Sequence, residues 1–389
     1  MKLMTETIQT QESQKTPIHA HTGLEDIIAA DSSICFIDGP RSRLIYRGYS
    51  INDLAEYATF EEVIYLLLFK KLPTGEELKN FSLGLSEKRS CSKDFLQRLN
   101  GIPKNANPMA VLRTLVSASS FFDDQSESMT YDSNLEKAIR MIAQIPTIIA
   151  AWDRVRLGQT PVEPRKDLSH AANFLYMLKG KESDPLYAKA LDSYLVMLAD
   201  HELNASTFAA RVTASTLADY YSAITSAIGA LKGPLHGGAN EQVLKMLLEI
   251  GELSSVENFV KKAFTEKKKI MGFGHRVYKV LDPRSPLLKS ISKQVCKMTG
   301  NEKLFKISEK LEELVVPAKK LPSNVDFFSA TLLYSIGIPV DLFTPMFVMS
   351  RLSGWSAHYL EQVSDNRLLR PRADYTGPMD LPFVPLEKR

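Results

Sequence analysis

Three short motifs along the chain each carry a side chain that can hold or transfer a proton. They are residues 234–241 with His236, residues 272–279 with His275, and residues 324–326 with Asp326. The imidazole of histidine titrates near neutrality, and its nitrogens can donate or accept a hydrogen bond. A carboxylate that is removed from water becomes a stronger base and can take a proton from carbon. Two imidazoles and one carboxylate therefore predict proton transfer beside a carbonyl group, the chemistry that forms a carbon–carbon bond.

His236 stands in a glycine-rich stretch, after Gly233 and before Gly237 and Gly238. Glycine lets the backbone come close to a ligand, and a helix is expected to begin just after this stretch. A helix N-terminus lowers the pKa of a nearby imidazole, so a neutral His236 could donate a hydrogen bond to a developing enolate oxygen. An incidental histidine in a turn is the other interpretation, and the spacing alone leaves both open.

A second glycine motif, Gly-Phe-Gly at 272–274, has Lys269 before it and Lys279 after it. Positive charge beside a loop of close backbone approach suits a ligand that carries phosphate groups. The loop is not a dinucleotide-binding fingerprint, because Val277 stands where that motif needs glycine or alanine, and the chain has no P-loop. The lysines could instead form the solvated face of a helix.

Asp326 is expected at the start of a helix and is followed by Phe327 and Phe328. This position also suits a side chain that caps the helix or pairs with its dipole. The two phenylalanines would supply the apolar surroundings that raise the basicity of a carboxylate.

Three arginines could bind the carboxylates of a small di-acid, because a guanidinium pairs with a carboxylate through two parallel hydrogen bonds. They are Arg284, Arg351 and Arg370, although any one of them alone would more often form a surface ion pair. No metal site is expected. His201 and Glu202 match the start of the zinc motif HExxH, but Ala205 replaces its second histidine.

The composition is typical of a globular enzyme with one large or two unequal domains, at 389 residues with 44% hydrophobic and 24% charged side chains. A net charge of +3 gives no reason to expect nucleic acid as a partner. Three separated cysteines without CxxC spacing fit a reducing compartment. The N-terminal residues lack the apolar segment of a signal peptide, and no apolar run reaches the roughly 18 residues of a membrane span. We therefore expect a cytoplasmic protein without a membrane partner.

Helical spacing dominates the chain, so we expect an all-α fold. The one strong strand signal is a small N-terminal β-hairpin around Asp38 and Gly39. Capping boxes at Thr59 and Thr74 and the Asn107-Pro108 pair mark three helix starts. Further helical patterns cover 168–179, 186–200, 204–231, 239–250, 303–314, 326–336 and 342–363.

Two domains and a terminal arm are expected. Residues 1–22 are polar and predict a flexible arm. Residues 23–228 and 337–389 would form a large helical domain, and residues 229–336 a small helical domain. Glycine-rich turns, a lysine run and two prolines interrupt the helices of the small domain.

From about residue 23 to 377 the chain resembles the citrate synthase family of the shorter bacterial and archaeal type. The resemblance rests on motifs that follow one another in the family's order: residues 199–211, 234–241, 272–279, 282–284, 324–326 and 370–372. Several long motifs in one order are specific, whereas a single GxGH would not be.

The resemblance implies a role for each candidate residue. Asp326 would remove a methyl proton from acetyl-CoA while His236 hydrogen-bonds the thioester oxygen, and His275 would polarise the ketone of oxaloacetate. The citryl-CoA formed would be hydrolysed in the same site. Oxaloacetate would be bound by His201, His236, His275, Arg284, Arg351 and Arg370, and CoA by Lys269, Gly272, Phe273, Gly274 and Lys279.

The resemblance also implies a homodimer in which Arg370 reaches the site of the partner subunit, with a higher homo-oligomer left open. The small domain would close over oxaloacetate, which excludes water and protects the thioester. Acetyl-CoA is a substrate, so no cofactor and no metal are expected.

Three alternative functions compete with this prediction. A 2-methylcitrate synthase would use propionyl-CoA in the same site, and one methylene discriminates by only about 1–3 kcal/mol. A citrate-cleaving enzyme of the ATP-citrate lyase type would need nucleotide-binding domains for which the chain leaves no room. A catalytically silent helical scaffold would not require His236, His275 and Asp326.

Overall fold

The structure is a computed structural model and describes residues 22–24 and 27–389. Its contacts divide the chain into two compact units. One is Ser32–Leu368, and the other comprises Leu369–Arg389 with the described residues before Ser32. Apart from Thr22, the predicted arm at residues 1–22 lies outside the described residues.

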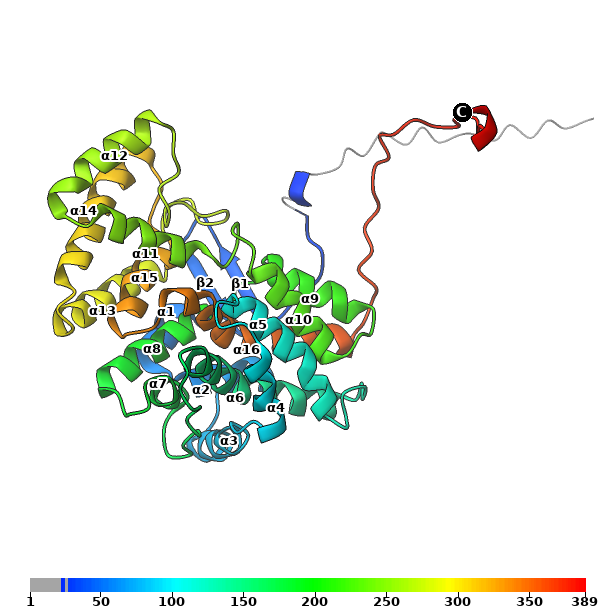
Figure 1. The fold of residues 1–389 in the computed structure, drawn as a ribbon, viewed down its shortest axis with the longest axis horizontal. Helices are drawn as coiled ribbons and strands as arrows, with labels where there is room; N and C mark the ends of the chain where they lie inside the picture. Colours follow the sequence, from blue (N-terminus) through cyan, green and yellow to red (C-terminus); the bar gives the residue numbers. More distant parts are fainter. Residues whose placement is uncertain (1–21, 25–26) are drawn as a thin grey trace, which may run out of the picture. The chain divides into compact units, whose positions relative to one another are not determined.

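The all-α prediction is confirmed, because helices build nearly the whole of the larger unit (Figure 1). They are α1 (Ile51–Tyr57), α2 (Phe60–Phe69), α3 (Gly75–Glu87), α4 (Lys93–Gln97), α5 (Pro108–Ala118), α6 (Tyr131–Arg156), α7 (His170–Lys179), α8 (Pro185–Leu198), α9 (Ala205–Ser215), α10 (Tyr220–Leu231), α11 (Ala239–Ile250), α12 (Val256–Thr265), α13 (Ser285–Met298), α14 (Glu302–Lys319), α15 (Val325–Ser335) and α16 (Phe343–Ser364).

The hairpin is confirmed as β1 (Cys35–Asp38) paired antiparallel with β2 (Arg43–Tyr46). A short third strand, β3 (Tyr49–Ser50), pairs with β2 and was not predicted. It forms because Arg47 and Gly48 both take positive φ, which turns the chain back. The sheet places Tyr46 in the core, where its hydroxyl donates to Asp200 O at 2.8 Å.

The predicted helix starts are also confirmed. Thr59 and Thr74 form complete capping boxes, and Asn107 caps α5 with Pro108 in its first turn. These signals succeed because a cap is decided by a few neighbouring residues.

Two helix predictions were wrong or incomplete. The single helix expected over 204–231 is two helices, since α9 ends at Ser215 and Asp219 caps a new helix through the N–H of Ser222 at 3.0 Å. Helices α12 and α13 were not predicted. They lie where lysines and prolines obscure the apolar spacing, and their buried faces are narrow.

Helix α16 runs through the core of the larger unit and packs against α2, α6, α8, α9 and α10. Its residues are buried from Phe343 to Leu360 on nearly every side, as expected of a helix with little polar surface. Figure 1 shows α11 to α15 grouped on one side of this unit, with α15 packed against both α11 and α13. The division into a large and a small domain stays a prediction.

Candidate active site

Six predicted site residues of the larger unit come from five different segments. His201 lies in the turn after α8, His236 between α10 and α11, His275 and Arg284 before α13, Asp326 in the first turn of α15, and Arg351 in the middle of α16. Burial lowers the pKa of His201 well below its usual value, and the charges that lower it further are those of Arg284, His275, Arg351 and His236. The charges of Arg284 and Arg351 also act on Asp326, so the fold brings the six residues into one electrostatically connected cluster.

His236 is held as a neutral donor. The backbone N–H of Ser206 points at His236 Nε2 at 3.3 Å, and Ser206 Oγ lies 2.9 Å from the same atom. A backbone N–H can only donate, so Nε2 accepts and the ring proton is left on Nδ1. Burial, and after it the charge of Arg351, lowers the pKa of His236 to about 4. These two causes keep the ring neutral at physiological pH.

His275 is neutral for a similar reason but carries its proton on the other nitrogen. The N–H groups of Val277 and Tyr278 donate to His275 Nδ1 at 3.0 and 3.2 Å, which leaves the proton on Nε2. Burial and the charge of Arg284 lower its pKa to about 4. His236 and His275 thus offer one N–H each at neutral pH.

Asp326 does not cap its helix. Asn324 is the cap and accepts the N–H of Asp326 at 3.1 Å, so the carboxylate is free for another role. Among the described residues, the buried Oδ1 of Asp326 has no hydrogen-bond partner. Burial raises the pKa of Asp326 to about 7 against the opposing charges of Arg284 and Arg351. A carboxylate of this pKa is a far better base than one in water.

The two arginines are both fully inside the protein, with Arg284 2% and Arg351 1% exposed. Arg284 is fixed by Asp282, which accepts its Nε at 2.9 Å and one terminal nitrogen at 2.8 Å. Asp282 also accepts the N–H of Val325 at 3.1 Å, which ties Arg284 to the start of α15. Asp282 already supplies an anion to Arg284, so Arg351 is the buried cation that is costly unless a further anion joins it.

The glycine loop is joined to the segment that carries Asp326. Gly272 O accepts the N–H of Asn324 at 2.9 Å, and Gly274 O accepts the side-chain amide of Asn324 at 2.9 Å. Both glycines have positive φ, and a Cβ on Gly272 would lie 2.6 Å from a ring carbon of Phe327. Phe273 is buried against Phe327, at 4.6 Å between ring centroids. The predicted CoA-binding lysines, Lys269 and Lys279, are exposed beside this loop.

Arg370 is exposed and belongs to the unit with Leu369–Arg389. Its place relative to the cluster in the larger unit therefore stays a prediction.

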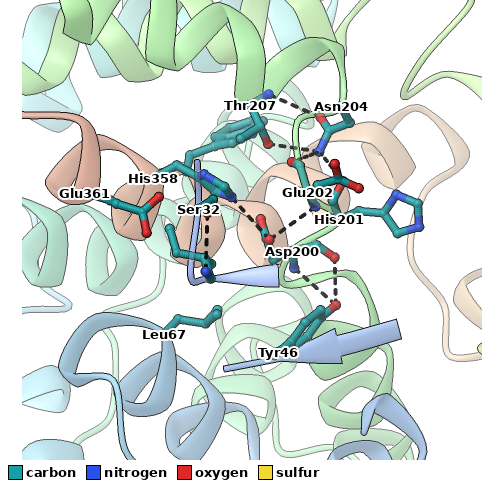
Figure 2. A network of polar contacts seen from close by, with 12 residues as sticks. Ser32, Tyr46, Leu67, Asp200, His201, Glu202, Asn204, Thr207, His358 and Glu361 are labelled. Atoms are coloured by element: carbon teal, nitrogen blue, oxygen red, sulfur yellow. Dashed lines mark hydrogen bonds and ion pairs between the residues drawn. The ribbon is translucent and has the colours of Figure 1, made fainter. Parts of the chain in front are cut away.

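A network of polar contacts ends at Asp200, the residue before His201 (Figure 2). Arg211 donates to Glu361 at 2.7 Å and lies 3.1 Å from Nδ1 of His358, whose Nε2 lies 3.3 Å from Asp200 Oδ2. Because Arg211 can only donate, Nδ1 of His358 accepts, and Nε2 carries the proton that His358 gives to Asp200. Burial would raise the pKa of Asp200, but His358 and Arg351 hold it below its usual value. The network fixes an ionised Asp200 directly before His201, whose ring points away from it (Figure 2).

Gly354 of α16 allows this arrangement. Its N–H donates to Ala199 O at 3.1 Å, and a Cβ at this position would overlap Ala199 O and Asp200 Oδ1. Sequence reasoning missed this contact as well as Asp200, His358 and Ser206. The signal that could have found Asp200 and Ser206 is that both lie in the motif at residues 199–211.

We expect Gly354→Ala to lower the free energy of unfolding by about 1–3 kcal/mol, the usual cost of overpacking, and to disturb the turn that presents His201. Urea unfolding and oxaloacetate titration would measure both effects. Gly84→Ala is the matched control, because Gly84 of α3 faces open space and alanine favours helix. Equal stability of the two variants would contradict the assigned contact.

Comparison with known proteins agrees with this geometry. The family model described as "Citrate synthase, C-terminal domain" matches residues 23–372. The chain is 49% identical over 371 residues to citrate synthase 2 of Bacillus subtilis, covering 95% of this chain and 99% of that protein. It is 39% identical over 361 residues to a citrate/2-methylcitrate synthase of the same organism, covering 92% and 97%.

Solved structures give the same result. A citrate synthase of Thermotoga maritima superposes with a TM-score of 0.86 at 44% identity, covering 95% of this chain and 99% of that chain. A citrate synthase of Thermoplasma acidophilum, in a ternary complex with carboxymethyl coenzyme A and oxaloacetate, superposes with a TM-score of 0.90 at 34% identity, covering 95% of this chain and 100% of that chain. The chain belongs to the citrate synthase family.

Proposed function

We propose that this protein is a citrate synthase, which condenses acetyl-CoA with oxaloacetate and hydrolyses the citryl-CoA formed to citrate and CoA. The observation that carries the proposal is the buried carboxylate of Asp326, with a pKa of about 7, in one site with two neutral imidazoles and two buried arginines. Family membership supports the same reaction, because the similar protein in Bacillus subtilis is named a citrate synthase.

The condensation needs three protein groups. Asp326 takes a proton from the methyl carbon of acetyl-CoA, while the Nδ1–H of His236 stabilises the oxygen of the enolate that forms. The nucleophilic carbon of this enolate then attacks the ketone of oxaloacetate, and the negative charge moves to the ketone oxygen, which becomes an alkoxide stabilised by the Nε2–H of His275. Neutral imidazoles suit these tasks, since each donates one proton without placing a further cation beside Arg284 and Arg351.

Charged side chains bind oxaloacetate, and a glycine loop with two lysines binds CoA. Arg284, Arg351 and His201 hold the oxaloacetate dianion, which supplies negative charge beyond that of Asp282, the partner of Arg284. The loop at 272–274 with Lys269 and Lys279 binds CoA. Because Asn324 joins this loop to the segment that carries Asp326, binding of CoA and placement of the base are coupled.

Further properties belong to the proposal. Arg370 completes the oxaloacetate site of the partner subunit in a homodimer, and residues 229–336 close over the substrates. The enzyme uses no cofactor, since the side chains above supply the proton transfers.

The cytoplasm is the proposed compartment, because Cys35, Cys91 and Cys296 are all free thiols. Among the described residues no helix is long and apolar enough to cross a membrane, and no cluster of side chains could hold a metal ion.

The test is the release of CoA thiol when the protein is mixed with oxaloacetate and either acetyl-CoA or propionyl-CoA. We expect a higher kcat/KM with acetyl-CoA. A preference for propionyl-CoA would identify a 2-methylcitrate synthase, and no release from folded protein would leave only a silent scaffold.

The rate should depend on pH through Asp326. Below its pKa of about 7 the carboxyl is protonated and cannot act as a base, so kcat/KM should fall about tenfold for each pH unit below 7. His236 and His275, with pKa values of about 4, stay neutral across this range. A pH profile of kcat/KM between pH 5 and 9 measures the midpoint, with circular dichroism to confirm folding at each pH. A kcat/KM that stays constant down to pH 5 would contradict the assignment of Asp326 as the base with a pKa near 7.

A further inference from the structure

Tyr278 is a buried side chain that the proposed mechanism does not use. It follows His275 by three residues and is only 1% exposed. Among the described residues its hydroxyl has no hydrogen-bond partner. Buried hydroxyls are nearly always paired, because removing one from water without a partner costs free energy. An unpaired one beside a substrate site indicates that the substrate is the missing partner.

The ring of Tyr278 contacts both imidazoles assigned to oxaloacetate. Its centroid lies 4.7 Å from the ring of His275 and 5.6 Å from that of His201, and these two rings are 5.2 Å apart. The N–H of Tyr278 also donates to His275 Nδ1 at 3.2 Å. The three rings therefore form one cluster, and the position of Tyr278 is fixed by the same contacts that fix His275.

The charge that acts most strongly on the hydroxyl is that of Arg284. Burial raises the pKa of the Tyr278 phenol well above its usual value and the charge of Asp282 raises it further, whereas the charge of Arg284 lowers it. The phenol therefore keeps its proton at neutral pH and is a donor. Arg284 cannot accept that proton, because a guanidinium carries only donors. Arg284 already donates to Asp282, whereas the hydroxyl of Tyr278 still needs an acceptor that the described residues do not supply.

We propose that the hydroxyl of Tyr278 donates a hydrogen bond to the oxaloacetate carboxylate that Arg284 binds. Tyr278 is then a substrate-binding residue, and the ketone remains the partner of His275. The inference rests on the proposed function, since it takes oxaloacetate as the anion in this site.

Tyr278→Phe removes one oxygen and keeps the ring contacts with both histidines. Loss of a hydrogen bond to a charged group should raise the Kd and KM for oxaloacetate about tenfold or more. The kcat and the KM for acetyl-CoA should stay within about twofold of the wild type, because the reacting atoms are untouched. Isothermal titration with oxaloacetate and steady-state kinetics measure these values.

Tyr220→Phe is the matched control. Tyr220 is also fully buried, but its hydroxyl is already paired with Ser356 Oγ at 2.7 Å in the contact between α10 and α16. This variant should lose stability without any change in the Kd for oxaloacetate. An equal loss of affinity in both variants would mean that the effect on Tyr278 is structural, and would overturn the proposal.

The remaining outcomes separate this inference from the proposed function. Wild-type protein that neither binds oxaloacetate nor releases CoA would overturn both. Wild-type protein that does both, with a Tyr278→Phe variant that binds oxaloacetate equally well, would overturn only the inference. A variant with a lower kcat and an unchanged KM would place the hydroxyl on the reacting atoms and contradict its assignment to the carboxylate.

Discussion

Asp326→Asn should lower kcat by about 10³-fold, within the 10²–10⁴ range of a general base, and leave the Kd for oxaloacetate nearly unchanged. The amide has the shape of the carboxylate but cannot take a proton. Its cap contact is also preserved, because Asn324 receives the backbone N–H of residue 326 rather than its side chain. Stopped-flow CoA release and oxaloacetate titration would measure the two values.

The stability of the same variant checks that the loss is chemical. The folded protein raises the pKa of Asp326 to about 7, above the roughly 3.9 of an unfolded aspartate, so the folded state favours the protonated form. The ionised carboxylate therefore destabilises the fold increasingly between about pH 4 and 7, and Asp326→Asn should not lower the melting temperature at pH 8. Asp53→Asn, in the exposed first turn of α1, controls for helix-dipole effects. A near-normal rate in Asp326→Asn would mean that another group is the base.

Arg351→Gln should weaken oxaloacetate binding by about 10²-fold or more, since losing one member of a buried, hydrogen-bonded charge pair costs about 2–5 kcal/mol. In the protein alone, Arg351 donates to Leu198 O at 2.7 Å and lies 4.8 Å from the ring centre of Phe347. Glutamine can keep a similar contact with Leu198, but it brings no charge to a carboxylate. Titration with oxaloacetate measures the change.

The pH profile gives an independent readout of the Arg351 charge. Arg351 lowers the pKa of Asp326, so its removal should raise that pKa and move the acidic limb to higher pH. Arg156→Gln is the matched control: Arg156 donates to Asp153 at 2.6 Å and to Asp341 at 2.8 Å, outside the site. It should cost stability only. Unchanged affinity and an unmoved limb in Arg351→Gln would remove Arg351 from the oxaloacetate site.

Local features of the fold could be predicted because their causes are local. The capping boxes at Thr59 and Thr74 involve residues three positions apart, and the hairpin depends on one turn. The break between α9 and α10 was missed because small residues continue the helical pattern through it, and only the cap at Asp219 marks the new start.

For the candidate site, too, the residues could be predicted from the sequence but the contacts between them could not. The residue types and their order indicated proton chemistry and suggested His201, His236, His275, Arg284, Asp326 and Arg351. The positions of the ring protons could not be predicted, since they depend on the N–H groups of Ser206, Val277 and Tyr278. Nor could the raised pKa of Asp326, which comes from burial by the assembled fold.

The sequence by itself determined that the protein is helical, which motifs carry the chemistry and which family it resembles. Only the tertiary structure decided how those motifs work together. His358 and Asp200 are 158 positions apart, and Arg351 and Leu198 are 153 apart, yet each pair is in contact. Such contacts leave no periodic or local pattern, because they depend on how helices pack. The same packing makes Asp326 basic and keeps His236 and His275 neutral, and it buries the hydroxyl of Tyr278 without a partner among the residues that the structure describes.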